Sequence, residues 1–253
     1  NGGTEIELAR ESAAQRAPKL EALIALDTRA FGTGREARVL VTCAMPIALS
    51  VLARAGVGED RIGSVQLERG RALANIERVY AKRVIGVREE IPQAGLARAA
   101  LCELLVRGSL FREAVATTRT RLSRSGLAAK LAARAQRGAA APAQPTLEAW
   151  LLARLETLGV ESGDDLAMLS AHDFLAPELP FEVRDALDRE YPLVVSVGDA
   201  TYRAEYDVEK FQVSLHMLKG SRREPPTLAF LPKFPGLRIC VEGPRGVAVL
   251  RER

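Results

Sequence analysis

The spacing of apolar positions changes twice along this chain of 253 residues. Up to about residue 92, short runs rich in β-branched residues alternate with polar positions, which is typical of strands. From residue 93 to residue 140, alanine, leucine and arginine follow one another without proline, which predicts helices. The rest of the chain begins with helical spacing and turns to short strands. The pattern predicts an α+β protein with parts 1–92, 93–140 and 141–253, and the main boundary in the linker Arg137–Thr146.

The first part has the element order of a small barrel. Strands are expected at Glu5–Ala9, Lys19–Arg29, Ala37–Ala44, Arg61–Glu68 and, as one long final strand, Ala72–Val87. Within the second strand, Leu23, Ile24 and Leu26 are the core candidates. Pro46 is expected to open a short helix that Gly56 closes. Three strands, a short helix and two strands is the order of an OB-fold-like β-barrel, although another small α+β barrel would share it.

The second and third parts are expected to combine helices with a strand-rich end. An apolar stripe of Leu101, Leu104, Leu105 and Val106 marks the basic helical segment, which Gly108 and Gly126 are expected to interrupt. The third part, a second mixed α+β module, is expected to begin with a helix from Leu147 that Gly159 stops, followed by helices at Asp164–Pro180 and Phe181–Pro192. Its strands are expected at Leu193–Val197, Thr201–Asp207, Gln212–Met217, Leu237–Val241 and Val247–Leu250.

Charge is distributed unevenly along the chain. The formal net charge is +4, but residues 93–140 carry nine cations and two anions, and residues 141–253 carry 13 cations and 18 anions. A block as basic as the first of these is a footprint for polyanions, although a solvated helix face would look the same. The opposite charges of the two parts would also let them dock on each other.

One set of residues is a candidate nucleic-acid surface. Alternation along the long final strand places Arg78, Tyr80 and Lys82 on one face, where the ring would stack on a base and the cations would follow phosphates. The alternative is a solvated strand face with Tyr80 packed under a loop. The basic helical segment adds four candidate nucleic-acid-binding cations: Arg119, Arg121, Arg124 and Lys130.

No complete catalytic motif is present in the sequence. The stretch Gly56–Ser64 is rich in glycine but lacks the lysine of a phosphate-binding loop. Ser170, His172 and Asp173 are too close along one predicted helix to act as a triad, so helix capping is the expected role of Ser170 or Asp173. We therefore expect no catalytic residues and no cofactor-binding site.

Metal and disulfide chemistry are not expected either. The three cysteines, Cys43, Cys102 and Cys240, are far apart, and the two histidines do not complete a zinc site with them at any usual spacing. We expect three free thiols in apolar surroundings. In the stretch Phe230–Gly246, a bend rich in proline is expected to serve either as a phosphate-contacting loop or as a rigid turn that lets Phe230 and Phe234 fill the core.

The composition indicates a cytoplasmic protein. No apolar run approaches the roughly 20 residues that a membrane-spanning helix needs, and the first residues lack the apolar core of a signal peptide. A start at Asn1 instead of methionine favours a piece of a longer chain.

The string QLERGRALANIERVYAKRVIGVREEIP resembles the stretch after the helical bundle of HrpB-type bacterial DEAH-box helicases. The continuation GLARAALCELLVRGSL is similar to the helix that follows in that family, and NGGTEIEL looks like the first strand of the same barrel. The helices around Trp150 and "LDREYP" are similar to the family's C-terminal domain. The family's usual ending is replaced by PGLRICVEGPRGVAVLRER.

This resemblance implies a non-catalytic C-terminal portion of an ATP-dependent RNA or DNA helicase, contributing nucleic-acid binding or regulation. ATP and Mg²⁺ would then be bound by RecA-like core domains that are not in this chain. The expected partners are these core domains and single-stranded nucleic acid, RNA in preference to DNA, and no membrane. The alternative is a protein–protein interaction scaffold without direct nucleic-acid contact.

Overall fold

The computed structural model describes residues 6–10, 12–16, 21–32, 38–136, 142–221, 224–243 and 246–251. Its strands form three small sheets with helices among them, which confirms the predicted α+β class. The chain divides into two compact units, each made of two segments. Unit 1 contains residues 1–109 and 155–169, and unit 2 contains residues 110–154 and 170–253. The predicted division into parts 1–92, 93–140 and 141–253 stays a prediction.

The first sheet of unit 1 has three strands in the order β1-β3-β2. They are β1 (Ile6–Leu8), β2 (Ala22–Phe31) and β3 (Arg38–Ile47), and β1 runs parallel to β3. All three were predicted, although the first residues of each predicted strand lie outside the described residues. A short 3₁₀ helix, η1 (Ala13–Arg16), follows β1.

Two details of this region differ from prediction, and one agrees with it. Pro46 lies inside β3 and does not open the short helix, since α1 (Leu49–Arg54) begins three residues later. Gly56 follows α1 with a φ of +76°, as expected of a residue that ends a helix. Leu26 is 61% exposed and is not a core residue, because a bulge in β2 interrupts the alternation there.

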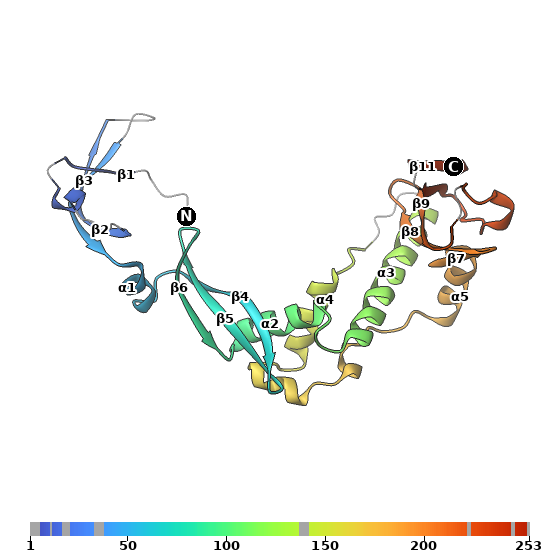
Figure 1. The fold of residues 1–253 in the computed structure, drawn as a ribbon, viewed down its shortest axis with the longest axis horizontal. Helices are drawn as coiled ribbons and strands as arrows, with labels where there is room; N and C mark the ends of the chain where they lie inside the picture. The colour runs from blue at the N-terminus through green and yellow to red at the C-terminus, as the bar shows by residue number, and fades with distance from the viewer. Residues whose placement is uncertain are drawn as a thin grey trace. The chain divides into compact units, whose positions relative to one another are not determined.

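The second sheet of unit 1 is an antiparallel meander of β4 (Glu59–Glu68), β5 (Arg71–Tyr80) and β6 (Arg83–Glu90) (Figure 1). The prediction of one long strand over Ala72–Val87 is wrong, because the chain reverses at Ala81 and Lys82. No strand pairing joins this sheet to the first one among the described residues. The OB-fold-like β-barrel therefore stays a prediction.

The core of unit 1 lies between the meander and α2 (Ala94–Val106). Arg107 and Gly108 follow this helix, so the predicted interruption at Gly108 is confirmed. The buried side of the meander and the apolar stripe of α2 share the fully buried residues Ala74, Ile76, Leu101, Leu104 and Leu105. The packing leaves no room for a side chain at Gly163 in η3 (Gly163–Met168), because a Cβ there would lie 2.6 Å from the Ala72 carbonyl oxygen.

Unit 2 combines helices with a five-stranded sheet of order β11-β10-β9-β8-β7. Its strands are β7 (Val194–Val197), β8 (Ala200–Asp207), β9 (Gln212–Lys219), β10 (Arg238–Gly243) and β11 (Gly246–Arg251). All five were predicted. The helices are α3 (Arg112–Ala135), α5 (Phe181–Glu190) and the short η4 (Ala171–Phe174) and η5 (Leu228–Phe230). The helix predicted from Leu147 to Gly159 is α4 (Leu147–Thr157), which belongs to unit 2 as far as Arg154 and to unit 1 from Leu155 onward. It bears the fully buried Leu151 and Leu155.

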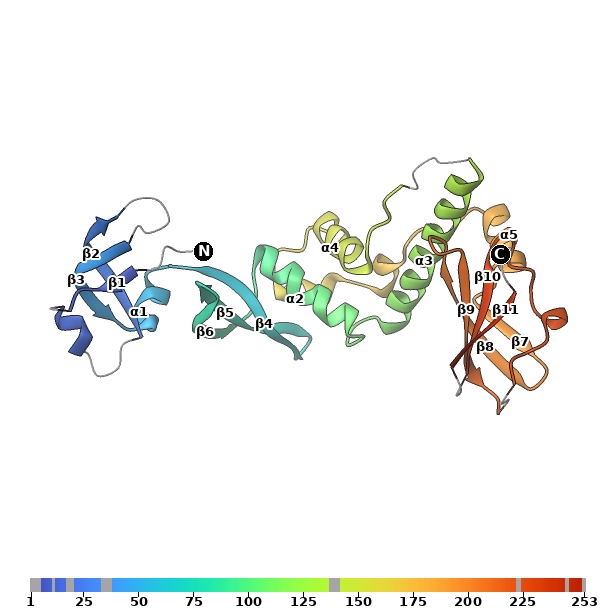
Figure 2. The same ribbon diagram turned by 90° about the horizontal axis from the view of Figure 1, so that it is seen from above.

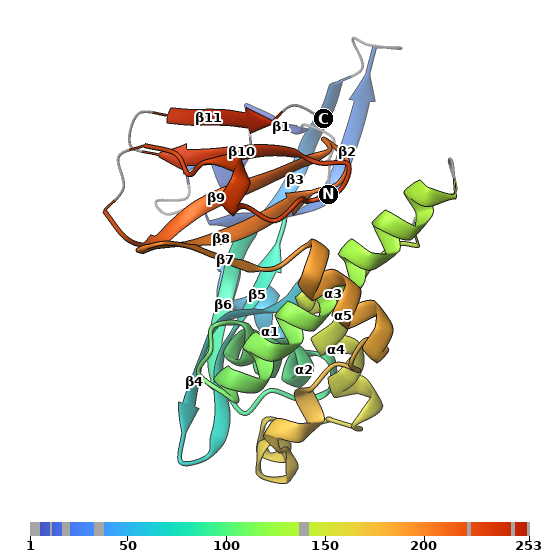
Figure 3. The same cartoon turned by 90° about the vertical axis from the view of Figure 1, so that its right-hand side faces the viewer.

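Helices α3 and α5 lie along one face of the five-stranded sheet (Figures 2 and 3). Leu127 of α3 and Leu187 of α5 enter the same apolar core as Tyr202, Leu215 and Ile239 of the strands. Burial of this face supplies the main driving force for packing in unit 2, at about 25 cal/mol for each Å² of apolar surface.

Two predictions about helices are wrong. Gly126 lies inside the continuous helix α3 and does not interrupt it. Residues 164–180 do not form one helix, since they contain the 3₁₀ helices η3 and η4 with an extended stretch after them. One continuous helix does not form because Ser162 and Ser170 are the N-cap residues of η3 and η4, and each serine starts a separate 3₁₀ turn.

The predicted rigid turn near the C-terminus is confirmed for one of its two aromatic residues. Phe234 is fully buried in the core of unit 2, whereas Phe230 is 70% exposed and fills no core.

The helices in the described ranges include none that is both long and apolar enough to cross a membrane. Cys102 and Cys240 are buried as expected, but Cys43 is exposed.

Candidate nucleic-acid interface

The turn between β5 and β6 is built from two residues with positive φ, Ala81 at +46° and Lys82 at +65°. Two consecutive residues in this conformation form the type I′ turn that closes two-residue hairpins. Tyr80 and Arg83 face each other across the turn in the strand register. The turn thus places Lys82 at the tip of the hairpin and not on the face of a strand.

Arg78 lies on the covered side of the meander, two residues from the fully buried Ile76. Its Nε and Nη2 atoms lie 2.7 and 3.0 Å from the carboxylate oxygens of Asp60 in β4. Nη1 donates to the carbonyl oxygens of Gly56 and Gly58 at 3.3 and 3.1 Å. With these donors occupied, Arg78 holds the entry to β4 against β5 and has little left to offer to a phosphate.

Asp60 also binds a second arginine, Arg88 of β6. Arg88 donates to both carboxylate oxygens, at 3.0 and 2.7 Å. The hydrogen bond from Arg88, followed by the charges of Arg88 and Arg78, lowers the pKa of Asp60 below its ordinary value, against the opposing effect of burial. This carboxylate therefore links all three strands of the meander.

Tyr80, Lys82 and Arg83 are all exposed at the hairpin tip, and Tyr80 is 41% exposed. Within the described part of the chain, no ion pair engages Lys82 or Arg83. The base of Tyr80 is backed by Gly58, where a Cβ would lie 2.5 Å from the Val79 carbonyl oxygen and 3.2 Å from Tyr80 Cβ. The tip thus presents an exposed tyrosine beside two cations that no ion pair within the described residues neutralises.

The cations of α3 have a different environment. Arg121 donates to the Ala176 carbonyl oxygen at 2.5 Å and pairs with Glu178. Arg124, which is buried, pairs with Asp188 of α5 and donates to the Tyr191 carbonyl oxygen at 2.9 Å.

Two further cations of α3 lie nearer its C-terminal end. Lys130 pairs with Glu209 at 2.9 Å. Arg134 donates to the Gly236 carbonyl oxygen at 3.1 Å and lies over the ring of Phe211. Three of the four candidate cations of the basic segment are thus used within unit 2, where acidic partners neutralise them.

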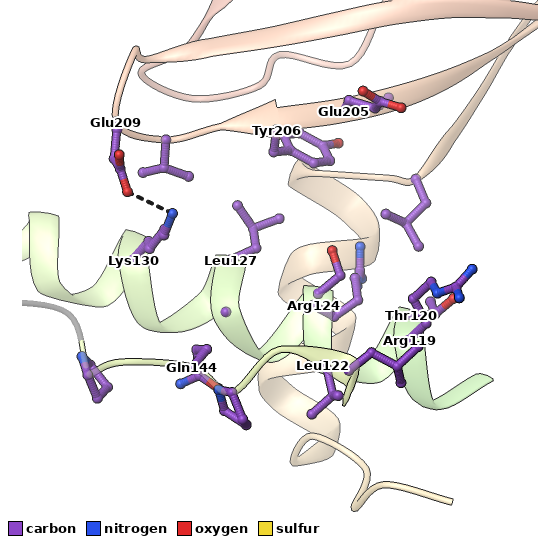
Figure 4. Close-up of a pocket in the computed structure, with 18 of the residues that line it drawn as sticks. Arg119, Thr120, Leu122, Arg124, Leu127, Lys130, Gln144, Glu205, Tyr206 and Glu209 are labelled. Atoms are coloured by element: carbon purple, nitrogen blue, oxygen red, sulfur yellow. Dashed lines mark hydrogen bonds and ion pairs between the residues drawn. The ribbon is translucent and has the colours of Figure 1, made fainter. Parts of the chain in front are cut away.

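Arg119 is the exception among these four. It is exposed, and within the described residues no ion pair or hydrogen bond engages its side chain. It lines a groove of about 1230 Å³ between α3, the segment 142–147 and strands β7 and β8. Figure 4 shows Lys130 and Glu209 joined across this groove, with Tyr206 and Glu205 on the strand that faces α3. Arg203 of β8 also lines the groove.

The seven predicted residues do not form one site. Arg78, Tyr80 and Lys82 belong to unit 1, and Arg119, Arg121, Arg124 and Lys130 belong to unit 2. Sequence reasoning missed two exposed cations, Arg83 and Arg203. A hairpin turn recognised at Ala81 and Lys82 would have identified Arg83 as the partner of Tyr80, whereas no local signal identifies Arg203.

Of the triad-like residues Ser170, His172 and Asp173, the first and the last form a helix cap. The Asp173 carboxylate accepts from the Ser170 backbone N–H at 2.8 Å and from its hydroxyl at 2.7 Å. These two hydrogen bonds lower the pKa of Asp173. The predicted capping role is confirmed, and the serine hydroxyl points to the carboxylate and not to a base.

Comparison with known proteins gives a structural similarity only. No family model matches the chain, and no curated protein matches it. The chain matches the crystal structure of the E. coli DExH-box NTPase HrpB with 18% identity and a TM-score of 0.32, over 95% of this chain and 30% of that chain. It matches the Escherichia coli DEAH/RHA helicase HrpB with 17% identity and a TM-score of 0.31, over 94% and 30%. The chain thus spans 30% of the length of these solved chains.

Proposed function

We propose that this chain is a non-catalytic portion of an ATP-dependent RNA or DNA helicase and that it contacts single-stranded nucleic acid through the β5–β6 hairpin tip. Tyr80, Lys82 and Arg83 carry this proposal. An exposed ring gives a base a surface for stacking, and the two neighbouring cations can neutralise phosphates on either side. The sequence resemblance to HrpB-type helicases supports the same class of function.

In this proposal the chain supplies binding, and the RecA-like core domains of the helicase supply ATP hydrolysis with Mg²⁺. We expect the ligand to be RNA in preference to DNA. The hairpin would belong to an OB-fold-like β-barrel, a fold whose exposed strands and loops commonly bind oligonucleotides. The proposal needs no catalytic residue in the chain.

The test is fluorescence anisotropy with unstructured single-stranded RNA and DNA oligonucleotides at low salt. We expect Tyr80→Leu, which keeps apolar bulk but removes the ring, to weaken binding about tenfold, because stacking contributes about 1–3 kcal/mol per base. The double variant Lys82→Glu/Arg83→Glu should weaken it at least as much.

Arg69 provides a matched control for these variants. It lies in the β4–β5 turn, at the opposite end of β5, with an exposed side chain and a positive φ like that of Lys82. Arg69→Glu should leave affinity within about twofold, since rim charges away from a site contribute little. An equal loss in Arg69→Glu, or no binding by the unmodified chain, would overturn the proposal.

A second candidate function is a protein-interaction scaffold. One observation favours it: the basic helix α3 is neutralised by carboxylates of the same unit, through Arg121, Arg124 and Lys130. The hairpin variants separate the two functions. A folded Lys82→Glu/Arg83→Glu chain that loses affinity for single strands supports direct contact, whereas an unmodified chain that binds no single strand at low salt supports the scaffold.

A further inference from the structure

Strand β11 forms one edge of the five-stranded sheet of unit 2. Figure 3 shows it as the last strand of that sheet, and no described strand pairs with it on the side away from β10. Residues 246–250 contain no charge and no proline, and Val247 and Val249 are 60% and 48% exposed. Sheet edges are commonly protected by charges, prolines or a covering segment, so an uncharged and exposed edge strand is open to pairing with another strand.

The backbone groups of Val247 and Val249 point to the open side of β11. The N–H of Arg238 in β10 donates to the carbonyl oxygen of the residue before β9 at 2.7 Å, and β10 pairs with β9 without a bulge. Because backbone groups alternate sides along a strand, Val241 of β10 then points toward β11, where it lies opposite Ala248. Ala248 therefore bonds to β10, and Val247 and Val249 offer their N–H and C=O groups to the open side.

A second copy of β11 fits this edge when it runs antiparallel, with Ala248 opposite Ala248 of the copy. In that register the outward groups of Val247 meet those of Val249 in the copy, which gives a hydrogen-bonded pair on each side of the symmetry axis. The four valines then lie in one row on the same face, where β-branched side chains pack well against each other. On the other face, Gly246 leaves room for Leu250 of the copy.

We propose that two copies of this chain associate through β11, so that their five-stranded sheets join into one continuous sheet across a twofold axis at Ala248. A strand from an unrelated partner would have to reproduce the apolar pattern of β11, whereas a second copy has it by symmetry. Two strands of six residues form a small interface, so the dimer depends on protein concentration. The proposal is independent of the nucleic-acid contact, since β11 belongs to unit 2 and the hairpin to unit 1.

Sedimentation equilibrium of the full chain over a series of concentrations measures this association. The mass should rise from 27.4 kDa toward twice that value. Val249→Lys should weaken association at least about tenfold, because it places two like charges in the row of valines and protects the edge. Val194→Lys is the matched control, since Val194 is an exposed valine of β7, the strand at the other end of the sheet. It should leave association within about twofold.

Cysteine cross-linking tests the register of the two strands. Because Cys43 is exposed, the variants are made in a Cys43→Ser background. Ala248→Cys should form a covalent dimer with the oxidant diamide, since Cα atoms of a pair that is not hydrogen-bonded lie about 4.5 Å apart, within reach of a disulfide. Val247→Cys should cross-link far less, because it lies diagonal to its own copy at about 7–8 Å.

Three results would refute the proposal of a dimer through β11. The first is a mass of 27.4 kDa at the highest concentration reached. The second is equal weakening by Val249→Lys and Val194→Lys, which would place the contact elsewhere. The third is equal cross-linking of the Ala248→Cys and Val247→Cys variants, since that outcome is incompatible with a fixed strand register.

Discussion

At the scale of single residues, Asp60 of unit 1 is notable because its one carboxylate binds arginines of two neighbouring strands. It receives hydrogen bonds from Arg78 of β5 and Arg88 of β6, while it belongs to β4 itself. Its carboxylate is 19% exposed, so water screens these charges only in part. A residue that joins three neighbouring strands stabilises their register as well as their charge balance.

The pKa of Asp60 predicts a pH dependence of stability. Because the folded pKa lies below the unfolded value of 3.8, ionised Asp60 contributes stability that is fully present above the unfolded pKa. That contribution is lost as pH falls through the folded pKa. Asp60→Asn should lower the free energy of unfolding by about 1–3 kcal/mol at neutral pH, because Arg78 keeps its charge without its carboxylate.

Urea unfolding at several pH values checks this prediction. The difference between the unmodified chain and Asp60→Asn should shrink below about pH 4, where Asp60 protonates in the unfolded state. Glu77→Gln is the control, since Glu77 pairs with one partner, Arg61, whose side chain is 61% exposed. A difference that stays constant from neutral pH to pH 3 would contradict the role assigned to Asp60.

At the scale of elements, α3 is a helix of 24 residues that contains a glycine near its middle. Glycine in a helix interior costs about 1 kcal/mol relative to alanine. The segment 142–147 passes close to Gly126, but a Cβ there would lie 3.5 Å from Gln144 Cγ, an ordinary van der Waals contact. The helix therefore gains nothing from glycine that alanine could not provide.

Gly126→Ala should stabilise the protein by up to about 1 kcal/mol, through the lower entropy of the unfolded chain and better helix propensity. The thermal midpoint should rise by about 2–4 °C for a chain of this size. Gly159→Ala is the opposite control, since Gly159 has a φ of +72° and alanine is strained there. A lower midpoint for Gly126→Ala would show that α3 needs glycine for its contact with residues 142–147.

The elements that could be predicted from sequence are those with local signals. The five strands of unit 2 combine β-branched residues with loops rich in proline and glycine. The β5–β6 hairpin was missed because Ala81 and Lys82 adopt positive φ without glycine, asparagine or aspartate. Gly126 suggested a break, but the packing of α3 on the sheet of unit 2 outweighs the local cost of one glycine.

The residues of the candidate site could also be predicted only where the sequence carries a local signal. Tyr80 and Lys82 were identified from residue type, and both are exposed at the hairpin tip. Their shared face with Arg78 was wrong for Lys82, since strand alternation ends where the turn begins. The carboxylates that neutralise Arg121 and Arg124 lie more than 50 positions away in sequence. No pattern within the basic segment could have indicated those partners.

At the scale of the whole molecule, net charge overstates the surface available to a polyanion. The basic segment 93–140 carries nine cations, but Arg98, Arg107, Arg121, Arg124 and Lys130 all have carboxylate partners. A cation paired in this way releases no counterion when a phosphate approaches. The unpaired cations at the hairpin tip should therefore dominate the salt dependence of binding.

This argument predicts a shallow salt dependence. Two cations, Lys82 and Arg83, should give a slope of log affinity against log salt concentration of roughly −1.4 for single strands, at about −0.7 per phosphate contacted. Anisotropy titrations with single-stranded RNA over a series of salt concentrations measure the slope. In Lys82→Glu/Arg83→Glu the slope should approach zero, whereas in Arg69→Glu it should stay unchanged. A steep slope that is retained in the double variant would place the phosphate contacts away from the hairpin.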